Sequence, residues 1–105
     1  HLGDNPAFLP AQQGFDEYVG IPYSNDMWPV DYDGKPITDT ANVRKRLYPT
    51  LRLVEGTQPT RVIQTLDDQA TLTATYTERA VAFIKKNRKN PFFLYVPHSM
   101  PHVPI

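Results

Sequence analysis

The sequence contains no cysteine, and this absence removes several kinds of chemistry. Without cysteine a chain has no disulfide framework, no thiolate metal site and no cysteine nucleophile. Any catalytic or metal-binding residues must therefore be side chains other than cysteine.

A surplus of charge and long apolar runs are lacking as well. Eleven Lys and Arg residues balance eleven Asp and Glu residues, so no net field steers nucleic acid or an anionic membrane toward the chain. The basic runs 44–46 and 85–89 are therefore interpreted as solvated faces. No apolar run is long enough to span a bilayer, and no signal segment opens the sequence. We expect no nucleic-acid partner and no membrane span.

What is present suits one small domain. The chain has 105 residues, of which 40% are hydrophobic, enough to form a core. It begins with His1 rather than Met and ends directly after a histidine segment. We expect it to be an excerpt from a longer polypeptide.

The strongest apolar signal lies near the end of the chain. Residues 92–96 are aromatic or branched and lie between Pro91 and Pro97, a length that suits a strand buried on both faces. We predict a central parallel strand over about 92–97. Ligands of open α/β sheets bind beyond the carboxyl ends of such strands, where His98 and His102 follow.

These two histidines favour proton transfer over metal binding. Histidine exchanges a proton near neutral pH, and a proline-rich segment would hold its ring in place. Four residues apart, His98 and His102 would form a metal pair on a helix, but Pro97 and Pro101 exclude a regular helix there. The competing interpretation is a surface loop whose histidines have no chemical role.

The first 66 residues predict loops and short strands. Frequent Gly and Pro interrupt residues 1–40, and one or two strand-like pieces are expected within 14–23. The polar residues 24–26 predict an ordinary turn. Between 47 and 66, two β-like runs flank a turn that contains Gly56, which predicts a hairpin.

Residues 68–89 show the clearest helical pattern. Apolar side chains recur at three- and four-residue steps at Leu72, Tyr76, Ala80, Phe83 and Ile84. Asp67 or Asp68 is the expected N-cap, and the basic cluster 85–89 suits the carboxyl end. A helix that leads into a buried strand is half of a βαβ unit, so the predicted fold class is α/β.

Five motifs occur in a characteristic order along the chain: His1–Gly3, Gly14–Tyr18, Gly20–Ser24, Asn90–Tyr95 and His98–Pro104. With them the sequence resembles the formylglycine-dependent sulfatases of the arylsulfatase A and N-acetylgalactosamine-6-sulfatase type over essentially its whole length. The resemblance implies a mixed-sheet fold like that of alkaline phosphatase, one bound calcium, and hydrolysis of sulfate esters by an aldehyde hydrate. Residues 1–105 would then be an incomplete part of a sulfatase catalytic domain.

The resemblance also assigns roles to individual residues. His1 would orient the hydrate and take its proton during sulfate release. His102 would stabilise or protonate the departing alkoxide, which is a poor leaving group. Ser24 would donate a hydrogen bond to a sulfate oxygen, and His98 would contact the substrate or support a residue that does. His1 and His102 should then face one anion-holding hollow.

Several family features are missing from the sequence. The nucleophile motif, Cys or Ser followed by x-Pro-x-Arg, is absent, and so are the acidic residues that hold calcium in the family. Formylglycine and calcium are therefore implied only outside this stretch, and the isolated chain is expected to be inactive. The alternatives are a phosphoryl-transfer hydrolase on the same fold and a non-catalytic interaction module that presents Pro101–Pro104.

Partners and location follow from the same resemblance. The expected substrate is a sulfated small molecule or glycan, and the expected location is periplasmic, secreted or lysosomal. A strand that is apolar on both faces needs neighbours on its edges. The rest of a sulfatase chain, or a second copy of this one, would cover them.

Overall fold

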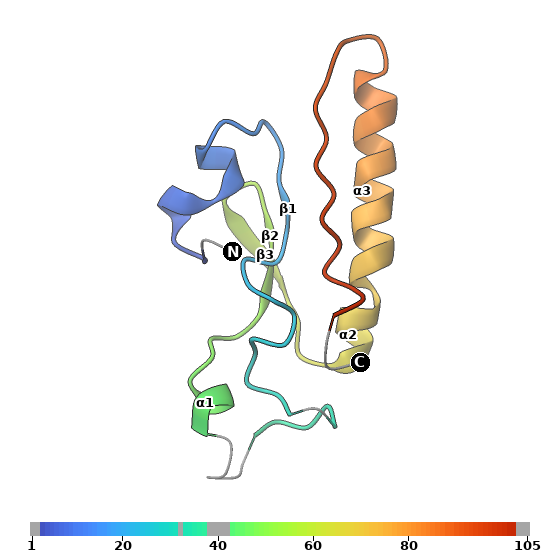
Figure 1. Cartoon of the computed structure of the whole chain (residues 1–105). Coiled ribbons are helices and arrows are strands. Elements are labelled where there is room, and N and C mark those ends of the chain that lie inside the picture. The colour runs from blue at the N-terminus through green and yellow to red at the C-terminus, as the bar shows by residue number, and fades with distance from the viewer. Residues whose placement is uncertain (1–2, 32, 38–42, 103–105) are drawn as a thin grey trace.

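The computed structural model describes residues 3–31, 33–37 and 43–102, and their arrangement is a small mixed α/β fold (Figure 1). A three-stranded sheet lies beside one long helix. Its elements are, in chain order, the 3-10 helices η1 (Pro6–Phe8) and η2 (Pro10–Gln12), β1 (Val19–Gly20), α1 (Val43–Arg46), β2 (Arg52–Glu55), β3 (Gln58–Val62), α2 (Leu66–Ala70) and α3 (Leu72–Asn87).

The sheet is antiparallel and has the order β1-β2-β3. The predicted hairpin is confirmed, because β2 and β3 pair from Glu55 opposite Gln58 to Arg52 opposite Val62. Gly56 in its turn has a φ of +61°, a left-handed conformation that glycine adopts without steric cost. The strand β1 confirms one of the strand-like pieces expected within 14–23.

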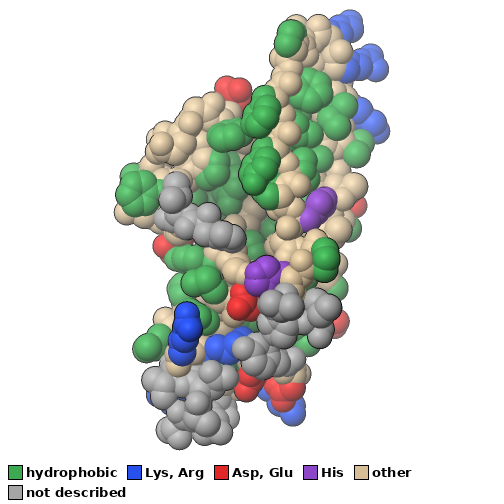
Figure 2. Space-filling view, viewed as in Figure 1, with side chains coloured by type: hydrophobic (Ala, Val, Ile, Leu, Met, Phe, Trp, Pro, Cys, Tyr) green, Lys and Arg blue, Asp and Glu red, His purple; other side chains and the backbone are tan. Residues whose placement is uncertain are grey.

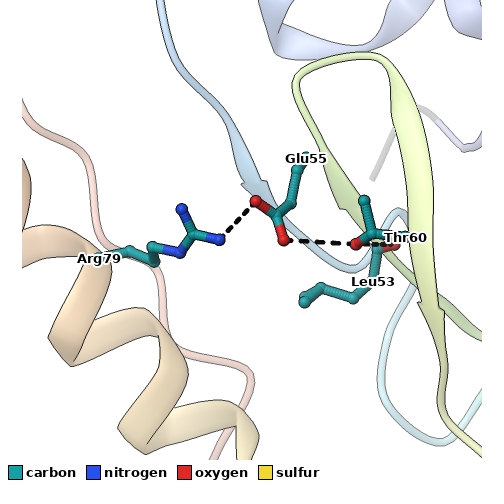
Figure 3. A network of polar contacts seen from close by, with 4 residues as sticks. All are labelled: Leu53, Glu55, Thr60 and Arg79. Atoms are coloured by element: carbon teal, nitrogen blue, oxygen red, sulfur yellow. Dashed lines mark hydrogen bonds and ion pairs between the residues drawn. The ribbon is translucent and has the colours of Figure 1, made fainter.

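The core lies between the sheet and the start of α3. Apolar side chains from both layers form one buried cluster: Trp28, Val30, Leu51, Leu53, Ile63, Leu72 and Tyr76. Above it, Arg79 of α3 forms an ion pair with Glu55 of β2, and Thr60 donates to the Leu53 carbonyl (Figure 3). The ion pair is partly exposed, so apolar burial contributes most of the attachment.

The predicted helix 68–89 is present as α2 followed directly by α3. Its cap was predicted wrongly: the N-cap is Thr65, whose extended backbone lets its hydroxyl accept the Asp68 N–H at 3.0 Å. Asp68 instead occupies the third helical position and completes a capping box. Lys85 and Lys86 lie in the last turn, as the basic cluster predicted.

The predicted central parallel strand over 92–97 is wrong for the described residues. Residues 91–100 carry no regular structure, and they run back along α3 in the opposite direction (Figure 1). Phe92 packs edge-on against Phe83, with ring centroids 5.4 Å apart. Phe93 and Tyr95 remain 73% and 67% exposed. An extended run becomes a strand only beside a hydrogen-bonded neighbour, and none of the described strands pairs with it.

Candidate functional site

The site is built on a turn that follows β1. Ser24, Asn25 and Asp26 form the predicted turn, which the Met27 N–H closes on the Ser24 carbonyl at 3.0 Å. The Ser24 hydroxyl donates to the Asp26 carboxylate, with 2.5 Å between Oγ and Oδ1. This bond fixes the direction in which the only hydrogen of the hydroxyl points.

His102 meets this turn from the far end of the chain. Its Nε2 lies 3.2 Å from Ser24 Oγ, across 78 residues of sequence. Because the Ser24 hydrogen is directed at Asp26, the serine oxygen can only accept, so Nε2 of His102 carries the donated hydrogen. Asp26, Ser24 and His102 are thus joined by two consecutive hydrogen bonds, and the His102 imidazole is exposed.

His98 lies apart from this chain. Its ring packs at a tilt of 43° on Tyr76 of α3, with centroids 6.1 Å apart. Burial raises the pKa of the Tyr76 hydroxyl, so Tyr76 is neutral at physiological pH. The described contacts do not join His98 to Ser24 or His102. Figure 2 shows the two described histidines, coloured purple, on one face of the molecule.

His1 lies outside the described residues, and its place beside His102 stays a prediction. The nearest described segment packs on the residue that precedes Ser24. A Cβ atom added to Gly3 would lie 3.8 Å from the Tyr23 ring. Burial, together with a hydrogen bond to the Asp4 carboxylate and its charge, raises the pKa of Tyr23 to about 12. The start of the described chain is therefore attached beside the Ser24 turn.

A hollow of about 430 Å³ lies next to this attachment, among Asp4, Tyr23, Arg52 and several prolines. Ser24, His98 and His102 are not among its lining residues. The Ser24–His102 contact is instead exposed, on the surface of the described part of the chain.

Three polar residues of the site were not singled out by the sequence. Asp26 was recognised only as a turn residue. Asn25 and Gln69 are both 4% exposed and hydrogen-bonded to each other. A signal for Gln69 existed, since it lies three residues before Leu72 and seven before Tyr76, on the apolar stripe of the helix. A glutamine at such a position needs a buried partner.

The interpretation of 44–46 as a solvated face is correct for Arg44 and Arg46 but wrong for Lys45. Lys45 is buried, and its ammonium donates to the Val30 carbonyl at 2.9 Å and the Asp26 carbonyl at 3.4 Å. The hydrogen bonds to these two carbonyl oxygens offset part of the cost of burying the cation. Lys45 thereby links α1 to the Ser24–Asp26 turn.

The described residues do not fit the cofactors of the resembled family. No three His, Asp or Glu side chains gather among them as a metal site would require. The sequence has no cysteine, and neither Ser24 nor Ser99 begins a Ser-x-Pro-x-Arg motif. In the part of the chain that is described, no helix has the length and apolar character to cross a membrane.

Comparison with known proteins identifies relatives over the whole chain. No protein-family model and no solved structure matches it. Arylsulfatase G of Rattus norvegicus is 35% identical over 125 aligned residues, which cover 100% of this chain and 22% of that protein. N-acetylgalactosamine-6-sulfatase of Mus musculus is 34% identical over 107 residues and covers 100% of this chain and 19% of its own length. The human N-acetylgalactosamine-6-sulfatase is 33% identical.

These relatives are all enzymes named as sulfatases. The chain is similar to sulfatases over its whole length, which confirms the resemblance seen in the sequence, and it spans about a fifth of the length of the curated relatives it matches.

Proposed function

We propose that this chain forms the leaving-group side of a sulfate-ester hydrolase site, with His102 as the general acid. The observation that carries the proposal is the contact of Ser24 Oγ with His102 Nε2, backed by Asp26. The sulfatase relatives support the reaction class. No feature of the described residues favours phosphate over sulfate or a non-catalytic role.

The chemistry follows from the leaving group. An alkoxide is a poor leaving group, so a proton delivered to its oxygen as the sulfur–oxygen bond breaks lowers the barrier. In this step His102 acts as an imidazolium: it delivers the hydrogen on Nε2 to the leaving oxygen and is left as a neutral imidazole. Ser24 holds the ring while no substrate is bound. When a sulfate ester binds, Nε2 turns its hydrogen to the leaving oxygen. The Ser24 hydroxyl donates to a sulfate oxygen only if its hydrogen turns away from the Asp26 carboxylate.

The remaining assignments come from the family resemblance. His1 would take a proton at the nucleophile, and His98 would border the substrate. The family resemblance implies a formylglycine nucleophile and one calcium ion, but the described residues do not fit either group. Both are proposed to lie in other parts of an alkaline-phosphatase-like catalytic domain, in a periplasmic, secreted or lysosomal protein.

The test compares two sulfate esters in the complete enzyme that carries this segment. The variant His102→Asn should lower kcat by on the order of 10²-fold to 10⁴-fold for an alkyl sulfate. The loss should be much smaller for 4-nitrophenyl sulfate, whose leaving group departs without a proton. His98→Asn is the matched change four residues earlier, and it should act on KM for both esters alike. An equal loss of kcat on both esters in His102→Asn would remove the general-acid role.

A further inference from the structure

We propose that Gln69 is a positioning residue of this site: its buried amide holds the Ser24–Asp26 turn at the distance from which Ser24 engages His102. The inference rests on the proposed function and adds a residue from a helix that no sulfatase motif in the sequence includes. Gln69 lies in α2, 45 residues after Ser24 in the sequence.

Gln69 is joined to the turn by two hydrogen bonds. Its Nε2 donates to the Asn25 carbonyl at 2.7 Å, and its Oε1 accepts from Asn25 Nδ2 at 3.3 Å. Both side chains are buried, so neither bond is weakened by competing water. The backbone of the residue between Ser24 and Asp26 is thereby attached to α2.

The same asparagine also contacts the segment that carries the histidine. Asn25 Nδ2 lies 3.8 Å from the Met100 sulfur, two residues before His102. Asn25 therefore contacts both sides of the Ser24–His102 pair, and Gln69 holds Asn25. Loss of the Gln69 amide would release the turn and weaken its packing against the C-terminal segment.

The helix that carries Gln69 is itself fixed at its start. The capping box of Thr65 and Asp68 ends at the residue directly before Gln69. Arg61 donates to Thr71 at 3.0 Å and attaches the end of α2 to β3. Gln69 thus projects from a short, doubly anchored helix. A positioning role requires such a support, since hydrogen bonds lose strength steeply with distance and angle.

A buried amide pair could also serve stability alone, and the two roles differ in one measurable respect. Loss of stability lowers the amount of folded enzyme and affects every substrate alike. Loss of His102 positioning affects substrates in proportion to their need for a proton. The leaving-group dependence of kcat therefore separates the two.

The experiment uses Gln69→Glu, which keeps the size of the side chain but turns an oxygen toward the Asn25 carbonyl. A misplaced catalytic group costs up to about 10²-fold, and we expect kcat for an alkyl sulfate to fall about tenfold more than kcat for 4-nitrophenyl sulfate. KM should stay within about twofold for both. Gln58→Glu, the same change on the exposed strand β3, should leave both values as in the wild type.

Equal losses on both esters, matched by a fall in melting temperature, would overturn the proposal. If Gln69→Glu does not fold, Gln69→Met, which lacks the amide but has a similar length, supplies the same comparison. A second readout is independent of turnover: the imidazole nitrogen NMR signals of His102, which report its hydrogen on Nε2, should change in Gln69→Glu and not in Gln58→Glu. Inactivity of the wild-type enzyme toward both esters would refute the proposed function, while unchanged His102 signals would refute the positioning role.

Discussion

At the scale of single residues, two aspartate carboxylates accept a hydrogen bond from a nearby hydroxyl group but serve different roles. Asp26 accepts the hydroxyl hydrogen of Ser24 and so directs the serine oxygen toward His102. Asp68 accepts from the Thr65 hydroxyl at 2.9 Å and from the backbone N–H groups of Gln64 and Thr65, each at 2.9 Å. The first arrangement organises a candidate reactive group, and the second starts a helix.

The capping role of Asp68 predicts a pH-dependent stability. Hydrogen bonds from Gln64 and Thr65 hold the pKa of Asp68 below its ordinary value of 3.8. A carboxyl group with a lowered pKa stabilises the fold above 3.8, and this contribution is lost as pH falls through the lowered value. Asp68→Asn should therefore be less stable than the wild type at pH 7, and the difference should shrink below pH 3.8.

Urea unfolding between pH 7 and pH 2 measures this difference. Asp67→Asn removes an equal charge from the same first turn without touching the three hydrogen bonds, so it is the matched control. A stability difference between Asp68→Asn and the wild type that stays constant over this range would contradict the assignment.

Single residues also show why some residues of the candidate site could be named from the sequence and others could not. Ser24 and His102 belong to recognisable motifs, so both could be named before their contact was seen. Thr65, Asp67 and Asp68 are all suitable cap formers, and only the extended backbone of Thr65 decides among them. The burial of Gln69 depends on Asn25, which is distant in sequence, and helical periodicity gives no account of such a partner.

At the scale of elements, local signals succeeded and a non-local one failed. The hairpin and the helix depend on neighbours within a few residues, and both are present. The predicted strand over 92–97 depends on a hydrogen-bonding partner that sequence patterns do not identify. The apolar residues of this segment do pack on other parts of the molecule. Among the described elements, however, they contact α3 and the loop containing Phe15 rather than a sheet.

The packing of α3 on the sheet predicts a large effect of one substitution. Leu72 is completely buried in the core cluster at the start of α3. Leu72→Ala should lower the free energy of unfolding by about 2–5 kcal/mol, because it removes apolar contacts and leaves a cavity. Leu47→Ala, at a position 78% exposed, should change it by less than about 0.5 kcal/mol. Chemical denaturation of both variants checks the prediction, and similar losses would mean that α3 is not held by this core.

At the scale of the whole molecule, the chain is more extended than its length requires. Its radius of gyration is 15.2 Å, whereas a compact chain of this size has about 13 Å. The apolar side chains of the segment after α3 contribute to an exposed surface: Phe92, Phe93, Tyr95 and Val96. Such a surface fits the proposal that other parts of a sulfatase cover it.

This surface predicts that the isolated 105-residue chain associates with itself. Its mean mass in sedimentation equilibrium should exceed 12.0 kDa and rise with concentration. Phe93→Lys should shift the mass back toward that of the monomer, because a charge in the patch opposes its burial. Leu47→Lys adds the same charge at an exposed site on another element and should leave association unchanged. A wild type that stays monomeric at all concentrations would refute the prediction.

The segment that returns along α3 is about as long as the helix itself. Sixteen helical residues advance by about 24 Å at 1.5 Å each, and the seven extended steps from Pro91 to His98 cover about 23 Å at 3.3 Å each. The two lengths are therefore similar, and the returning segment reaches the first turns of α3, where His98 packs on Tyr76 and His102 contacts Ser24. A substitution leaves the length of this segment unchanged, whereas an insertion does not. One inserted residue would displace the imidazole by about 3.3 Å, a full hydrogen-bond length, so the spacing between Pro91 and His102 constrains the site as strictly as the identity of its residues.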